Sequence, residues 1–194
     1  MVVTKLRTYH DEIAVGFCMR NEFLEKLSGG DLRSIGNVDF IVDEIQSQND
    51  FDELFACLSS DDRLIVMRTA DAVEKITIKH IDYLGSHKEE VLAFCKHADS
   101  IEFKWHLALL LPRLSLSENE YACVFHTLSS WLLDSKESKI VRVNSMQALY
   151  EFSKQDLIAK EKLDNMMNEV EKENLPSLLA RIRKIKRRWS GLCK

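Results

Sequence analysis

A helical stretch recurs along this chain at a fixed interval, and this recurrence restricts the possible folds more than any other feature. The stretch from Asp61 to Ile76 has the apolar spacing of one amphipathic helix. Its pattern, counted from Ile65, returns at Phe103 and again at Val141, each time 38 residues further along the chain. Self-similarity at such a period is typical of proteins that stack helix pairs and bury the apolar face of each pair against its neighbours. The sequence therefore predicts an all-α stack.

The composition agrees with long helices in a single domain. The chain has 194 residues, 45% of them hydrophobic, but only 2 Pro and 6 Gly. A sheet-rich protein needs more turn residues than this, and a chain of this length suits one hydrophobic core. We therefore predict one helical-repeat domain over residues 1–194.

Capping patterns and apolar stripes divide the region from 50 to 190 into helix pairs. The predicted pairs are 51–59 with 61–77, 87–97 with 100–114, 117–134 with 137–154, and 157–172 with 175–190. The first helix of each pair is expected to begin at a side-chain cap. These caps are Asp50 with Glu53, Ser86 with Glu89, Ser117 with Glu120, and Asp156. Pro112 lies late in its helix and predicts a kink or an early end there.

Residues 1–47 do not follow the 38-residue pattern. Helices are predicted over 4–28, ended by Gly29-Gly30, and over about 37–47. This segment is either a divergent first pair or a cap that covers the open end of the stack.

The repeated pairs resemble the HEAT and armadillo-type repeat family. The residues that carry the resemblance lie in the second helix of a pair, where Asp62 begins the helix, Arg68 is inside it, and Ala70 and Ala72 form a small packing turn. The resemblance implies a right-handed α-α superhelix of about four helix pairs with additional N-terminal helices. It also implies that the second helices line a concave face, which in this family usually binds a protein or a nucleic acid.

Superposition of the copies places polar side chains in rows on the second helices, because spacings of three and four residues share one helix face. The rows are Arg68, His106, Asn144 and Arg181; Asp71, Leu109, Gln147 and Lys184; and Lys75, Arg113, Glu151 and Arg188, with Lys104 and Arg142 nearby. We expect the polar members of these rows and Arg142 to form a binding face. The alternative is a solvated face that has no dedicated ligand.

Charge is distributed unevenly along the chain. From Asn174 onward there are seven bases and no acid, so residues 1–173 carry 20 bases and 31 acids, a net charge of −11. The basic helix from Arg181 to Trp189 has three interpretations. It caps the end of the stack, contacts nucleic acid, or is attracted to an acidic protein or an anionic membrane.

The residues show little evidence of catalysis, and we expect neither a cofactor nor a metal. Cys123 and His126 share a helix face but lack further ligands, and Gly29-Gly30 is not followed by the Lys-Ser or Lys-Thr of a phosphate-binding loop. The enzyme alternative is a resemblance to bacterial alkylpurine DNA glycosylases built from HEAT-like repeats. In such a protein Trp105, Asp71, Arg142 and Trp189 would be the groove residues.

The function expected from the sequence is that of a non-catalytic scaffold or adaptor, which binds a macromolecular partner on its concave face. A protein partner is the first expectation, and nucleic acid binding through the basic C-terminal helix is the alternative. The longest apolar run, from Leu107 to Pro112, is too short to span a bilayer. The first four of the five cysteines lie among apolar neighbours and are interpreted as reduced, which favours a cytoplasmic protein.

Overall fold

The computed structural model describes residues 22–29 and 38–191 of the chain. Every regular element in these residues is helical, which confirms the predicted all-α class. The α-helices are α2 (Glu22–Leu27), α3 (Val38–Glu44), α4 (Gln48–Ala56), α5 (Arg63–Lys79), α6 (Lys88–His97), α7 (Ile101–Leu110), α8 (Glu118–Leu133), α9 (Lys139–Ser153), α10 (Leu157–Glu171) and α11 (Pro176–Gly191). Short 3₁₀ helices are η1 (Cys57–Ser59), η2 (Ile81–His87) and η3 (Leu111–Arg113). Among the described residues, no helix combines the length and apolarity that a bilayer crossing requires.

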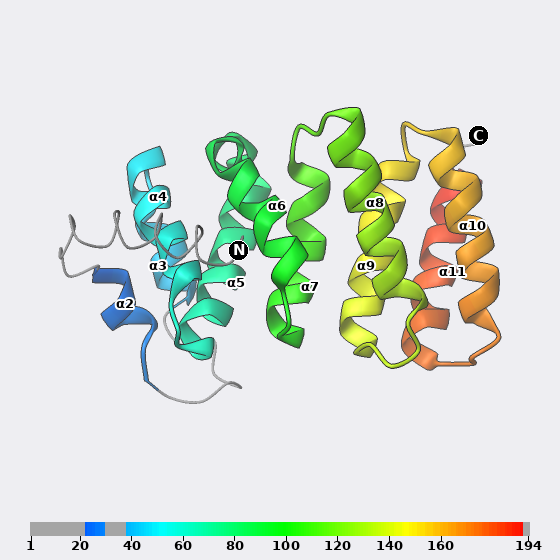
Figure 1. Ribbon diagram of the computed structural model, residues 1–194, viewed down its shortest axis with the longest axis horizontal. Helices are drawn as coiled ribbons and strands as arrows, with labels where there is room; N and C mark the ends of the chain where they lie inside the picture. The colour runs from blue at the N-terminus through cyan, green and yellow to red at the C-terminus, as the bar shows by residue number, and fades with distance from the viewer. Residues whose placement is uncertain (1–21, 30–37, 192–194) are drawn as a thin grey trace, which may run out of the picture.

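The helices from α4 to α11 form the predicted pairs, α4 with α5, α6 with α7, α8 with α9, and α10 with α11. Figure 1 shows these pairs side by side in chain order along the long axis of the molecule. The second helices α5, α7, α9 and α11 contact one another in sequence, and more extensively than the first helices do. They therefore form a continuous layer, which we call the second-helix layer.

The second-helix layer continues at its N-terminal end into α3, which packs against α5, and α2 contacts both. The predicted helix over 37–47 is thus confirmed as α3. Only the last part of the predicted helix over 4–28 lies within the described residues, as α2. Gly29 follows α2 with a φ of 74°, the left-handed conformation that was expected to end this helix.

One contiguous core runs through all the pairs, from Phe23 near the N-terminal end to Ile185 in α11. The apolar stripe predicted for the last helix is part of it, because Leu178, Ile182 and Ile185 are buried. Full burial of one such side chain contributes about 1.5–3 kcal/mol to folding. The terminal pair is therefore fixed by the same apolar packing as the central pairs.

The caps at the later pairs agree with the sequence, and two at the earlier pairs do not. Ser117 and Glu120 form the predicted capping box of α8, and Asp156 caps α10. The predicted Asp50 cap is wrong, because α4 begins at Gln48 and its capping box joins Ser47 to Asp50. The predicted Ser86 cap is also wrong. The η2 turn continues through Ser86 to the start of α6, so that α6 begins without a side-chain cap bond.

Pro112 has the predicted effect on its helix. α7 ends at Leu110, and the chain continues as the 3₁₀ turn η3 across Leu111–Arg113. Proline removes the backbone N–H that would continue the α-helical hydrogen bonds, so the early end follows from its chemistry.

Glu120 links two first helices as well as capping its own. Its carboxylate accepts a bond from the Ser117 backbone N–H at 2.7 Å and pairs with the Lys88 ammonium of α6 at 2.9 Å. These bonds, the Ser117 backbone bond first, lower the pKa of Glu120 from 4.5 to about 2.

We predict that Glu120→Gln lowers the thermal midpoint of unfolding at neutral pH, and that this deficit shrinks in acid. Because the folded-state pKa of about 2 lies below the ordinary 4.5, the ionised carboxylate stabilises the folded state above pH 4.5. That contribution is lost as the pH falls through about 2. Thermal melts followed by circular dichroism from neutral to acid pH measure the effect. Glu118→Gln, in the same helical turn, is the control, and an equal deficit at every pH contradicts the assignment.

Candidate interaction surface

The predicted polar rows do not all lie on an open surface. Arg68, His106 and Arg142 are 2%, 4% and 1% exposed, so these three were wrongly assigned to a binding face. Burial of a charged or polar group is costly unless hydrogen bonds replace its water. Each of these side chains has such partners on a neighbouring helix.

Arg68 binds the C-terminal end of α2. Its guanidinium donates to the carbonyl oxygens of Leu27 and Gly29, both at 2.6 Å, and more weakly to that of Ser28 at 3.3 Å. The last carbonyls of a helix have no partner within the helix, and they carry the negative end of its dipole. Arg68 therefore attaches α2 to α5 from inside the protein.

Arg142 makes a similar connection at the other end of the stack. Its Nε donates to the Leu132 carbonyl near the end of α8 at 2.8 Å. Its two terminal nitrogens donate to the two carboxylate oxygens of Glu173 at 2.7 and 2.6 Å. The guanidinium lowers the pKa of Glu173 through these bonds. Arg142 thus joins α8, α9 and the α10–α11 loop.

His106 and Arg113 both attach the second pair to α5. The His106 Nδ1 lies 2.7 Å from a carboxylate oxygen of Glu74. Arg113 donates to the Glu74 carbonyl at 2.6 Å and to the Thr77 hydroxyl at 2.5 Å. Burial lowers the pKa of the Arg113 guanidinium. The expected role of Arg113 on the face is therefore corrected as well, because its nitrogen is bound to α5.

The other eight predicted residues remain at least partly exposed: Asp71, Lys75, Asn144, Gln147, Glu151, Arg181, Lys184 and Arg188. Several of them are bonded to one another within a helix or to a residue of the neighbouring helix. Lys75 pairs with Asp71 at 3.0 Å and with Asp39 of α3 at 2.7 Å. Gln147 donates to Glu151 at 2.6 Å and accepts a bond from Arg181 of α11. Lys184 and Arg188 are the most exposed of the set.

The sequence analysis missed an apolar element in the middle of this surface. Trp105 and Leu109 of α7 are partly exposed, and neither belongs to the contiguous core or packs against it. Ile101 and Ile140 are exposed at the starts of α7 and α9. The 38-residue spacing aligns Trp105 with Met67, which is buried, so the repeat does not indicate that Trp105 is partly exposed.

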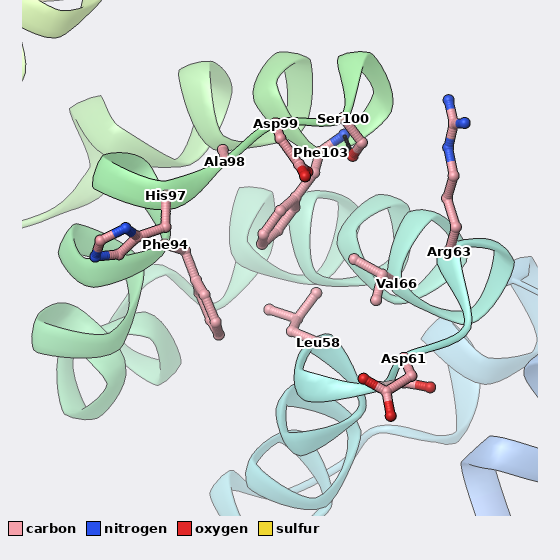
Figure 2. A pocket seen from close by; sticks show the side chains of 11 residues that line it. Leu58, Asp61, Arg63, Val66, Phe94, His97, Ala98, Asp99, Ser100 and Phe103 are labelled. Atoms are coloured by element: carbon pink, nitrogen blue, oxygen red, sulfur yellow. Dashed lines mark hydrogen bonds between the residues drawn. The ribbon is translucent and has the colours of Figure 1, made fainter. Parts of the chain in front are cut away.

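The pocket in Figure 2 offers no catalytic arrangement. It encloses 390 Å³ where the α5 pair meets the α6–α7 pair, with Phe94 and Phe103 directed into it. The two serine hydroxyls that line the pocket accept hydrogen bonds from backbone N–H groups. Ser60 accepts from the Asp62 N–H at 3.1 Å, and Ser100 accepts from the Phe103 N–H at 3.3 Å. Within the described residues, neither serine hydroxyl is hydrogen-bonded to His97, the histidine that lines the pocket.

Among the described residues, metal binding, a cysteine nucleophile and the glycosylase groove also have no assembled site. In the part of the chain that the structure describes, no three His, Cys, Asp or Glu side chains form a group that could hold a metal ion. Burial raises the pKa of Cys95 to about 11, which opposes a nucleophilic role. The glycosylase resemblance requires Arg142 in the groove, and Arg142 is instead buried against Glu173.

Comparison with known proteins gives no family for this chain. No family model, no curated protein and no solved structure matches it. Its function is therefore inferred from the geometry of this surface.

We predict that two basic residues of the same helix contribute very differently to stability. Arg68→Met leaves carbonyls of α2 without their donor and costs about 1–3 kcal/mol of unfolding free energy. Lys75→Met removes partly exposed ion pairs and costs less than about 1 kcal/mol. Urea-induced unfolding followed by circular dichroism measures both values. Equal losses for the two variants contradict the structural role assigned to Arg68.

Proposed function

We propose that this protein is a non-catalytic interaction scaffold of the HEAT and armadillo type. Its helix pairs form a right-handed superhelix, and the second-helix layer lines a concave face that binds a protein partner. The closer contacts among α5, α7, α9 and α11 than among the first helices support this curvature. Elements that approach more closely on one side of a stack bend it toward that side.

The proposal rests on the partly exposed apolar element on α7. Trp105 and Leu109 lie outside the contiguous core, on a helix in the middle of the second-helix layer. Protein interfaces concentrate their binding energy in a few aromatic side chains near the centre, which a polar rim surrounds. Trp105 provides such a centre.

Polar groups lie on both sides of this centre along the stack. On the α5 side are Asp71 and Lys75, and on the α9 side are Asn144, Gln147 and Glu151. The ion pair and the hydrogen bond among these residues hold their side chains in defined positions before a partner arrives. A preorganised rim of mixed charge favours a protein surface with its own donors and acceptors over a uniformly charged polymer.

We predict that a photo-crosslinking side chain at Leu109 captures a protein partner and that Trp105→Ala weakens the capture. Loss of a central aromatic contact should lower the yield about tenfold or more. The measurement is crosslinking in an extract of the source cells, with the captured proteins identified by mass spectrometry. Circular dichroism checks that Trp105→Ala is folded.

The matched control places the same crosslinker at Leu157, the first residue of α10, whose side chain is 81% exposed but lies on a first helix. A protein captured at Leu109, absent at Leu157 and sensitive to Trp105→Ala supports the scaffold. Equal capture at both positions, or capture that Trp105→Ala leaves unchanged, contradicts it.

A further inference from the structure

The last helix of the stack carries an uncompensated positive strip. Arg183, Lys184, Arg187 and Arg188 are all exposed on α11, and we call them the α11 strip. Their spacing forms two pairs four residues apart, so each pair lies on one side of the helix with about 5–6 Å between Cβ atoms. Within the described residues none of the four has an ion-pair partner.

Three acids on elements that neighbour α11 are already paired with residues outside the strip. Glu173 is held by Arg142, and Glu171 pairs with Lys186 at 3.3 Å. Glu151 of α9 pairs with Lys154. Burial and the charge of Arg188 lower the pKa of Arg181, as expected where cations are close together without an intervening acid. The strip therefore presents its positive charge to solvent.

The apolar side of α11 is not available for a partner. Leu178, Ile182 and Ile185 are buried against the rest of the stack. An amphipathic helix binds a membrane by inserting its apolar face, and α11 has none to insert. A protein interface likewise needs an apolar centre, and the four residues of the strip are all charged. A polyanion needs neither feature, because neutralisation of its charges can supply the whole of the binding.

We propose that the α11 strip binds the phosphate backbone of a single-stranded nucleic acid. Three of its four groups are guanidinium ions, whose planar donors match phosphate oxygens in pairs. Residues 1–173 carry a net charge of −11, which repels a long duplex lying across the body. A single strand can follow the exposed strip along α11 and avoid that surface. This site does not depend on the protein partner proposed at Trp105.

The test is the salt dependence of binding to fluorescein-labelled 20-mer oligo(U) and oligo(dT), measured by fluorescence anisotropy with the full chain. Four phosphate contacts on a single strand give a slope of about −2.8 for log affinity against log salt. Affinity should then fall about 150-fold between about 25 and 150 mM KCl. The variant Arg183→Gln/Arg187→Gln removes two contacts and should fall only about 12-fold over the same range.

The control Lys136→Gln/Lys139→Gln removes the same charge from exposed positions at the α8–α9 loop and should keep the full 150-fold fall. No binding of either oligonucleotide at low salt overturns the proposal, as does a control variant that loses as much as the strip variant. Equal affinity for a poly-glutamate peptide or for vesicles containing phosphatidylserine also overturns it, since the strip would then bind any anion. None of these results bears on crosslinking at Leu109, so the two proposals fail separately.

Discussion

Buried guanidinium groups at the ends of neighbouring helices are the interactions on which the stack depends. A helix ends with carbonyl groups that have no partner within it, and in a stack of short helices many of these ends meet other helices. Arg68 supplies donors to the end of α2, and Arg142 supplies one to the Leu132 carbonyl of α8. The two terminal nitrogens of Arg142 donate to the carboxylate of Glu173. A single side chain therefore joins parts of two successive helix pairs.

Some arginines of the second-helix layer are bound inside the protein, whereas the basic residues of the α11 strip are exposed. Arg68, Arg113 and Arg142 are bound to backbone or carboxylate groups inside the protein, so they cannot bind a partner without breaking those bonds. Within the described residues, the cations of the α11 strip make no such bonds to backbone or carboxylate groups. The apolar side chains Trp105 and Leu109 lie between the two ends of the layer. Packing thus leaves an apolar centre and a basic end for recognition.

The sequence predicted the all-α class and the four helix pairs because apolar packing recurs with every pair. The spacing of capping residues located the caps at Ser117 and Asp156, and the missing N–H of Pro112 predicted the early end of α7. The Ser47 cap and the η2 turn were missed because short polar segments offer several capping residues in a row. Which of them begins the helix is decided by packing that the sequence pattern does not contain.

The direction of the polar side chains could not be predicted in the same way. Helical spacing places a residue on a face of its helix, but a long arginine can reach inward from the edge of that face. The partners of Arg68 lie about 40 residues away in the chain, and Glu173, the carboxylate partner of Arg142, lies 31 residues away, in the next helix pair. Trp105 shows the opposite difference, since its equivalent in the repeat, Met67, is buried and Trp105 is partly exposed.

Buried arginines join successive helix pairs, and a double-mutant cycle between Arg142 and Glu173 measures the strength of one such connection. The cycle compares unfolding free energies of Arg142→Met, Glu173→Gln and the double variant with that of the parent chain. If the pair joins α9 to the last helix pair, the two substitutions should show a coupling energy of about 2 kcal/mol. Effects that simply add, within about 0.5 kcal/mol, would contradict the claim.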